Sequence, residues 1–230
     1  MGVEYNSKIV TDDLVFCIDA GNAKSYPGSG NTWKDLCTSD INGTLSGGPV
    51  FNTDVLQFDG SNDHVDFPSS SNFTFGTGDF TISWWLNYDV VGSNDSSIDM
   101  RGSSWETTAF SDYITASDKW ATWRKSTSYP SAADTWYTSS TTIVSNKWYN
   151  FVALRDSGTF KFYINNVLDG TVSFSENLSG GDLVVGWNVS DNAGRSFDGK
   201  FAWLGIYKGR ALSTTEITQN FNALKGRFGL

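Results

Sequence analysis

The chain has 230 residues, a formal net charge of -9 and a sequence pI near 4.5. Aromatic residues make up 15% of it, which is enough apolar material for the core of one large domain. No run of Lys and Arg occurs, and this argues against a nucleic-acid-binding protein. No apolar run approaches the ~20 residues that a membrane-spanning helix needs, so we expect no membrane insertion.

The N-terminal segment is polar and lacks the apolar stretch of a secretory signal peptide. We therefore expect residues 1–13 to form an N-terminal arm of a protein made in the cytoplasm, and residues 14–230 to form one domain. Cys17 and Cys37 have neither the spacing nor the neighbours of a metal site. A disulfide between them and two separate thiols fit the sequence equally well.

Most of the chain alternates short apolar runs with turns that are rich in Gly, Asn and Asp, a pattern typical of β-strands. In chain order we predict strands at residues 14–19, 55–58, 64–67, 80–88, 97–101, 108–114, 120–125, 135–138, 148–154, 160–164, 167–174, 182–187 and 197–207. Residues 32–36 return only briefly to apolar character, and a turn at 39–43 follows them. The strongest is FTISWWLNY at 80–88, in which Phe80, Ile82 and Trp84 share one parity.

The stretch KWYNFVALRDSGTFKFYIN at 147–165 predicts a central hairpin, because two apolar runs flank a short Asp-Ser-Gly link. Its first run is apolar at both parities, which indicates a strand covered on both faces. In the second run Phe160 and Phe162 alternate with Lys161 and Tyr163. We expect Trp148, Phe151, Phe160, Phe162 and Leu204 to lie in the core.

Only one helix is predicted, near the C-terminus. Ser213 and Glu216 have the spacing of a capping box, and Ile217, Phe221 and Leu224 then follow on one helical face. Gly226 is placed to end this helix, which should lie on the outer surface. The predicted fold class is therefore all-β, a two-sheet antiparallel sandwich with one short C-terminal helix.

Four segments in this order resemble the laminin-G-like, concanavalin A-like jelly-roll family. They are LQFDGSNDHVDF (56–67), DFTISWWLNY (79–88), NKWYNFVALRDSGTFKFYINNVLDGT (146–171) and SFDGKFAWLGIYKGRALSTTEI (196–217). The resemblance implies a jelly roll of two antiparallel sheets packed face to face. LVFCIDAGNAKSYPGSGNTWKDL (14–36) and NFNALKGRFGL (220–230) are similar to the ends of such domains in tailed-bacteriophage virion proteins, with marine phages as the best match. This implies a virion location and contacts with other virion proteins.

Some glycoside hydrolases share this fold and use two nearby carboxylates for catalysis, Glu-X-Asp-X-Glu or a longer variant in the related glucanases. This chain has only Glu4, Glu106, Glu176 and Glu216, and none has another Glu within five residues. We therefore predict that the protein is not an enzyme. The single histidine, His64, is expected to be a partly exposed strand residue.

We predict no cofactor. Calcium is the one alternative, because oxygen ligands could come from Asp19, Asp59, Asp63 and Asp198. The Asp-Gly pairs at 59–60 and 198–199 are equally ordinary in turns, so no ligand set is assigned. Members of the family often carry Asp-Glu in the last strand, where this chain has Ala202 and Trp203.

The region 89–146 is dense in aromatic and polar residues, and sugar-binding proteins stack exposed aromatic rings on sugar faces. The candidate glycan-binding residues are Trp105, Asp112, Trp120, Trp123, Arg124, Tyr129, Trp136 and Tyr137. Burial in the core is the competing interpretation, because most Trp residues of an all-β domain pack inside. Trp120 and Trp123 have opposite strand parity, so both rings cannot face the same side.

Two functions fit these features. The first is a non-catalytic phage virion protein, expected to be a homo-oligomer, that binds host-surface carbohydrate. The alternative is a purely structural virion component, such as a capsid decoration, head fibre or tail protein, whose aromatic residues pack against neighbouring subunits.

Overall fold

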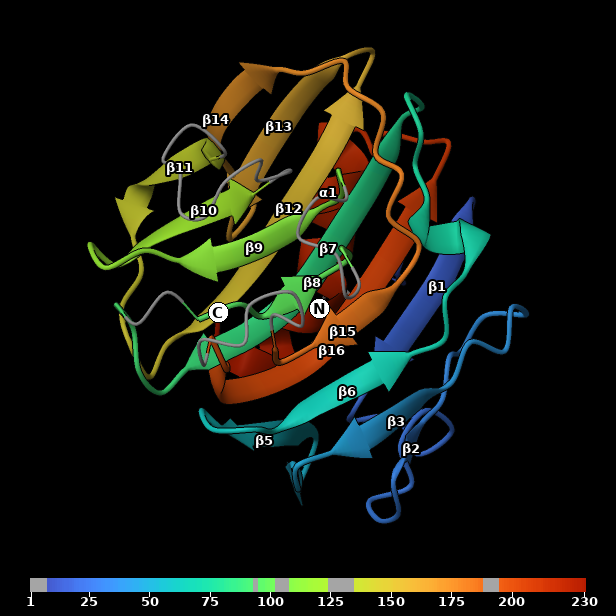
Figure 1. Ribbon diagram of the computed structural model, residues 1–230, viewed down its shortest axis with the longest axis vertical. Coiled ribbons are helices and arrows are strands. Elements are labelled where there is room, and N and C mark those ends of the chain that lie inside the picture. Colours follow the sequence, from blue (N-terminus) through green and yellow to red (C-terminus); the bar gives the residue numbers. More distant parts are fainter. Residues whose placement is uncertain (1–7, 93–94, 102–107, 124–134, 188–194) are drawn as a thin grey trace, which may run out of the picture.

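The structure is a computed structural model that describes residues 8–92, 95–101, 108–123, 135–187 and 195–230, with the side chains of residues 123, 135 and 136 excepted. Two eight-stranded antiparallel sheets lie face to face, and a helix covers the outer side of one of them (Figure 1). The all-β sandwich prediction is therefore confirmed. None of the described helices is long and apolar enough to cross a bilayer.

The first sheet, sheet A, has the order β14-β13-β12-β7-β16-β5-β4, and β1 also pairs with β16. Its strands are β1 (Leu14–Asp19), β4 (Val50–Asn52), β5 (Val55–Asp59), β7 (Phe80–Tyr88), β12 (Trp148–Asp156), β13 (Thr159–Ile164), β14 (Val167–Ser173) and β16 (Asp198–Lys208).

The second sheet, sheet B, has the order β11-β10-β9-β8-β15-β6-β3-β2. Its strands are β2 (Thr32–Trp33), β3 (Gly43–Ser46), β6 (His64–Phe67), β8 (Ile98–Asp99), β9 (Ser111–Ile114), β10 (Lys119–Trp123), β11 (Thr135–Thr142) and β15 (Leu183–Val185). The helical elements are η1 (Ser71–Phe73), α1 (Thr214–Leu224) and η3 (Lys225–Phe228).

The predicted central strand is confirmed. β12 lies between β13 and β7, with Phe151 and Ala153 in the core between the sheets and Val152 and Leu154 in a second cluster on the outer side. A strand that is buried on both faces has to be apolar at both parities, and this is the pattern that its sequence carries.

Of the five predicted core residues, Phe151, Phe160, Phe162 and Leu204 are buried, with relative exposures of 0–1%. Trp148 differs, because it is only half-buried on the outer side of sheet A, with its ring 4.4 Å from that of Phe228. It has the parity of Val152 and Leu154, so it faces the outer side of sheet A and packs against the cluster around Trp85 and Phe228.

The capping box of α1 is present, since Ser213 accepts from the Glu216 backbone N–H and Glu216 accepts from that of Ser213. The helix covers the outer side of sheet A, where Ile217 and Leu224 are buried. The α-helix ends at Leu224, just before Gly226 as predicted, but Gly226 does not have the left-handed conformation of a terminating glycine. The chain continues through η3, and Gly229, at φ 72°, provides the left-handed residue that closes it.

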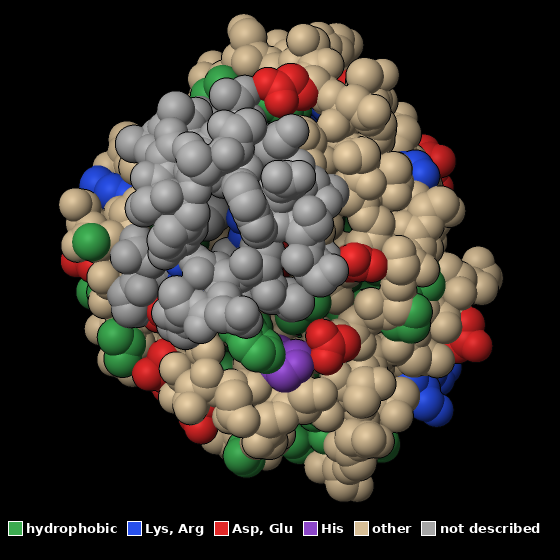
Figure 2. Space-filling model, viewed as in Figure 1, with side chains coloured by type: hydrophobic (Ala, Val, Ile, Leu, Met, Phe, Trp, Pro, Cys, Tyr) green, Lys and Arg blue, Asp and Glu red, His purple; other side chains and the backbone are tan. Residues whose placement is uncertain are grey.

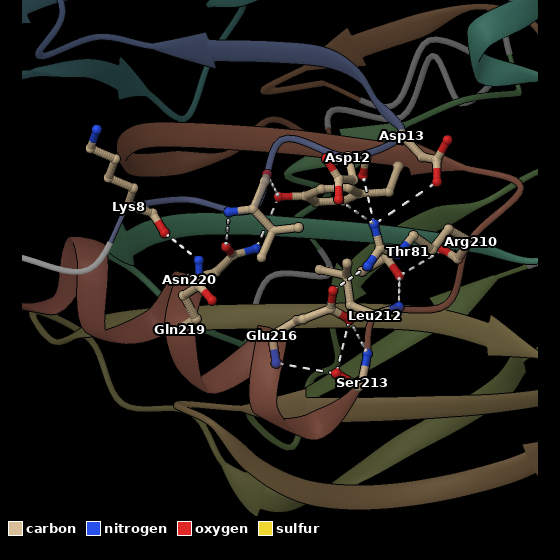
Figure 3. Close-up of polar contacts among 12 residues, drawn as sticks. Lys8, Asp12, Asp13, Thr81, Arg210, Leu212, Ser213, Glu216, Gln219 and Asn220 are labelled. Carbon is tan, nitrogen blue, oxygen red and sulfur yellow. Dashed lines mark hydrogen bonds and ion pairs between the residues drawn. The ribbon is translucent and has the colours of Figure 1, made fainter.

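Residues 8–13, part of the expected N-terminal arm, are docked against α1 (Figure 3). The Val10 N–H donates to Asn220 Oδ1 at 2.8 Å, Asn220 Nδ2 donates to the Tyr207 hydroxyl at 2.9 Å, and that hydroxyl donates to the Val10 carbonyl at 2.8 Å. Arg210 adds ion pairs to Asp12, Asp13 and Glu216. This closed ring of buried hydrogen bonds fixes residues 8–13 to α1.

Candidate functional site

Three of the predicted glycan-binding residues lie in the interior. Trp120 on β10 is 0% exposed, and its ring lies 4.7 Å from Phe151 and 5.5 Å from Trp84 across the sandwich. Tyr137 on β11 is also buried and stacks on Phe162 at 4.0 Å. These two rings join sheet B to sheet A, so the structure assigns them to the core and leaves no ring face for a sugar.

Asp112 is buried as well. Its carboxylate accepts hydrogen bonds from the backbone N–H groups of Ser97 and Ile98 and from the Ser97 hydroxyl, at 2.7–2.9 Å. Burial raises the Asp112 pKa to about 7, although these hydrogen bonds oppose the shift. The carboxylate therefore ties β9 to the start of β8 and is not available to a ligand.

The other five residues remain candidates. Trp105, Arg124 and Tyr129 lie outside the described residues. For Trp123 and Trp136 only the backbone is described. Trp123 ends β10, opposite Ser111 of β9, and Trp136 lies in β11.

The Tyr137 hydroxyl has a structural role at the edge of the sandwich. It donates to Asp169 on β14, whose carboxylate also accepts from the backbone N–H groups of Ser140 and Thr141, at 2.8 and 3.1 Å. Burial alone would raise the Asp169 pKa, but hydrogen bonds from Thr141, Tyr137 and Ser140 outweigh it and lower the pKa overall. Asp169 thus fastens β14 of sheet A to β11 of sheet B.

A different group of side chains meets at the surface of sheet B. We define the His64 site as His64, Asp66 and Trp187. His64 and Asp66 are two residues apart on β6 and therefore share its outer face, whereas Val65 and Phe67 belong to the core. Trp187 follows the neighbouring strand β15 and forms an isolated bridge with Ser196. Figure 2 shows the chain's single histidine on this face, beside acidic and hydrophobic side chains.

The three side chains of the His64 site are in contact. His64 Nε2 lies 3.1 Å from Asp66 Oδ2, and the His64 and Trp187 ring centroids are 4.7 Å apart at an interplanar angle of 60°. Trp187 is half-buried, and half of the Asp66 side chain is exposed. The site thus brings an indole ring, an imidazole ring and a carboxylate together in a partly exposed position.

The electrostatics favour a charged His64. Its Nδ1 lies 2.8 Å from the carbonyl oxygen of Asn62, which can only accept, and Nε2 faces a carboxylate. Both ring nitrogens therefore meet acceptors, which suits the imidazolium form. The hydrogen bond to Asp66 raises the His64 pKa above its usual value, and partial burial only reduces this shift.

Next to this site, the outer face of sheet B carries a buried ion pair. Val184 of β15 pairs with Asp66 on one side and with Asp99 of β8 on the other, so the backbones of the two aspartates lie about 10 Å apart at the usual strand spacing. Asp99 accepts two hydrogen bonds from the Arg101 side chain, at 3.0 and 3.1 Å. Asp99 is thus buried and paired with Arg101, whereas half of the Asp66 side chain is exposed.

The structure offers little for a metal ion. Among the residues it describes, no group of three or more His, Cys, Asp or Glu side chains is arranged to hold one. Asp59 Oδ1 accepts from the Ser61 backbone N–H within its turn. Burial, and then the nearby Asp89 and Asp59 carboxylates, raise the Asp198 pKa. Asp59 ends β5 and Asp198 starts β16, and these two residues pair with each other across the sheet.

Trp187 was not among the predicted site residues, and His64 was predicted only to be a partly exposed strand residue, which it is. A usable signal was present. Trp187 follows the apolar run 183–185 after one glycine, Gly186, and precedes a polar stretch, and His64 opens a strand after a turn. What was missing is the pairing of β15 with β6, which brings these two positions together.

Two antiparallel sheets packed face to face, with a helix on one outer side and a polar and aromatic site on the other, define a concanavalin A-type β-sandwich. The sequence model of the concanavalin A-like lectin/glucanases superfamily, in its laminin G form, matches residues 59–218. The chain therefore belongs to this family. No curated protein sequence matches it significantly.

Several solved structures share the fold. One is a Trypanosoma rangeli sialidase, with a TM-score of 0.69 and 14% identity over 94% of this chain and 33% of the sialidase. Another is botulinum neurotoxin type C, which depends on interaction with two ganglioside molecules to get into cells; the TM-score is 0.66, with 16% identity over 93% of this chain and 51% of the toxin chain.

A third is domain 4 of AbnA, an extracellular arabinanase from Geobacillus stearothermophilus, in complex with arabinotriose. Its TM-score is 0.66, with 16% identity over 92% of this chain and 98% of that domain. The chain thus spans about a third of the sialidase and nearly all of the arabinanase domain. At these identities the likeness shows the fold.

Proposed function

We propose that this protein is a non-catalytic carbohydrate-binding component of a tailed-bacteriophage virion, and that it attaches the particle to glycans of the host surface. Carbohydrate binding is supported by the family and by fold neighbours that bind gangliosides or arabinotriose. The phage assignment rests on the resemblance of segments 14–36 and 220–230 to virion proteins. In this proposal the protein is made in the host cytoplasm and acts on the virion.

The observation that carries the proposal is the His64 site. A half-buried indole ring and a half-exposed carboxylate, each in contact with His64, are suited to stacking on a sugar face and to accepting hydrogen bonds from its hydroxyls. Trp187 also lies just beyond the end of β15, and the ends of strands in a sandwich are where ligand contacts usually collect. Trp105, Trp123, Arg124, Tyr129 and Trp136 are proposed to add further contacts.

The described glutamates have other roles, which supports a binding protein over a hydrolase. Glu216 caps α1 and pairs with Arg210, and Glu176 is an exposed residue whose carbonyl accepts from Arg155. A retaining glycosidase needs two carboxylates about 5 Å apart, and an inverting one about 6.5–9.5 Å apart, across an open cleft. The proposed role is adhesion without cleavage.

Single-site affinity should be weak, because a sugar that stacks on one ring must also exchange its hydrogen bonds to water for bonds to protein. Millimolar binding corresponds to only about -4 kcal/mol. Many copies on one particle can raise the avidity by ~10²–10⁴-fold. A homo-oligomer or a virion array is therefore part of the proposal.

The test compares free protein with protein displayed in many copies on beads. Both are applied to an array of bacterial envelope polysaccharides, arabinan oligosaccharides and ganglioside glycans. We expect binding by the beads only, and its loss in Trp187→Ala with the thermal unfolding midpoint preserved. Val167→Ser, at an exposed edge position, is the matched control and should bind normally. If folded, multivalent protein binds none of these glycans, the adhesin proposal is wrong.

One observation favours the structural alternative. Val167 and Leu168 start the edge strand β14 and are 68% and 50% exposed. An apolar, unpaired strand edge is a natural contact for another subunit. If Val167→Ser disrupts assembly and no glycan binds, the protein is a structural virion component.

A further inference from the structure

The chain's only histidine lies against the ring that we propose binds sugar, and nothing in the fold requires a titratable group there. We infer that His64 is a positioning residue of the glycan site: as an imidazolium it holds the Trp187 ring against sheet B, so that glycan binding is stronger in mildly acidic than in alkaline solution. This inference rests on the proposed function and adds a regulating group to it.

The geometry of the two ring nitrogens carries the argument. Nδ1 keeps its proton at any pH at which the ring is neutral, because it faces the Asn62 carbonyl at 2.8 Å. The proton lost on deprotonation therefore comes from Nε2, which lies 3.1 Å from Asp66 Oδ2. Two acceptors would then face each other, and an attractive ion pair becomes a repulsive contact.

The contact between the His64 and Trp187 rings depends on whether His64 is protonated. The His64 and Trp187 rings meet at 60° with centroids 4.7 Å apart. A protonated imidazole is electron-poor, and its contact with the electron-rich indole is stronger than that of the neutral ring. Deprotonation weakens the His64 contact with Trp187 and its contact with Asp66 together. The indole ring is then held less firmly against sheet B.

The charges around His64 all act in one direction. Asp66 on the same strand and Asp63 in the preceding turn both favour the cation, and the hydrogen bond to the Asn62 carbonyl does the same. On β3, the residue that pairs with His64 is Ser46, which is uncharged. On the β15 side the contact is Trp187 itself. None of these groups is a cation that would oppose protonation.

Because the chain has one histidine, a nuclear magnetic resonance titration of the free protein tests the coupling without any ligand. The His64 ring protons and the Trp187 indole N–H should titrate with a shared midpoint above the ordinary value of about 6.5. Asp66→Asn should lower that midpoint, because it removes the carboxylate that stabilises the cation. If the Trp187 signal does not follow the His64 titration, the inference is wrong.

The second arm measures binding of bead-displayed full-length protein to the same glycan array, from about pH 5.5 to about pH 8.5. We expect wild-type binding to fall by roughly fivefold or more over this range, the lower end of typical couplings between linked groups. His64→Lys keeps a cation and should bind independently of pH. His64→Gln should bind weakly at every pH. Val167→Ser should keep the wild-type pH profile.

The two proposals fail differently. Binding that is equally strong across the pH range, with Trp187→Ala still defective, refutes the role of His64 and leaves the glycan site intact. Absence of binding to every glycan at every pH refutes the proposed function, and the pH-dependence of binding falls with it. His64→Gln with unchanged affinity at acidic pH also refutes the positioning role.

Discussion

Phe162→Ala should cost about 3–5 kcal/mol of unfolding free energy, the range for large-to-small changes at a buried aromatic position. Phe162 is 0% exposed on β13 and stacks on Tyr137 of β11, with ring centroids 4.0 Å apart and an interplanar angle of 3°. Trp120 of β10 lies 5.6 Å away, edge on. The ring thus joins the two sheets near their open edge.

The magnitude follows from these contacts. Full burial of a Phe side chain stabilises the fold by about 1.5–3 kcal/mol, and an aromatic pair adds about 0.5–1.5 kcal/mol. The cavity adds a further cost, because Tyr137 is held by Asp169 and cannot move into the space. At about 2–4 °C per kcal/mol for a domain of this size, the thermal midpoint should fall by roughly 6–20 °C.

Urea or guanidinium titration followed by Trp fluorescence measures the change. Phe162→Leu is the matched control and should cost well below the alanine change, because it keeps most of the apolar volume. Val167→Ala, at a site 68% exposed, should stay within about 0.5 kcal/mol of wild type. A loss below about 1 kcal/mol for Phe162→Ala would show that this ring does not join the sheets.

Three further predictions concern polar groups. Asp169→Asn should lower the free energy of unfolding by about 1 kcal/mol at neutral pH. Because the folded-state pKa of Asp169 is lowered, its contribution to stability is present above the unfolded-state pKa and is lost as the pH falls through the folded-state pKa. Denaturant titrations of wild type and variant should therefore give the same unfolding free energy in acid. Asn220→Ala should lower the free energy of unfolding by about 1–3 kcal/mol. It should also speed amide hydrogen exchange in residues 8–13, because it removes the hydrogen bonds that dock them. Unchanged exchange there would contradict the role of this buried ring of hydrogen bonds. Cys37 is a free thiol whose pKa is raised to about 12 by burial and then by Asp35, so the native protein should resist alkylation near pH 8 and react only on unfolding, as mass spectrometry can measure.

Much of the fold could be predicted from local pattern. The strands 14–19, 64–67 and 80–88 have the bounds that alternation and turn residues indicated, and the capping box starts α1 as predicted. These features depend on residues a few positions apart, and such residues carry their own backbone preferences. The α-helix ends near Gly226 as predicted, but the left-handed glycine is Gly229, because the short helix η3 carries the chain past Gly226.

The candidate site was less predictable. Composition drew attention to Trp120 and Tyr137, yet both lie in the core, because a strand's alternation separates two faces without saying which one the other sheet covers. His64 and Trp187 drew little attention, because each is a single residue at a strand end. Their contact requires β6 and β15 to pair.

By itself the sequence determined the all-β class, the hairpin at 147–165, the helix cap and the family resemblance, since each depends on short-range pattern or on an ordered set of motifs. Only the tertiary structure decided which aromatic rings are core, that Asp112 is buried, and that His64, Asp66 and Trp187 share one site. The physical reason is that burial and charge are properties of neighbours in space. In a sandwich most of those neighbours come from strands that are far apart in the chain.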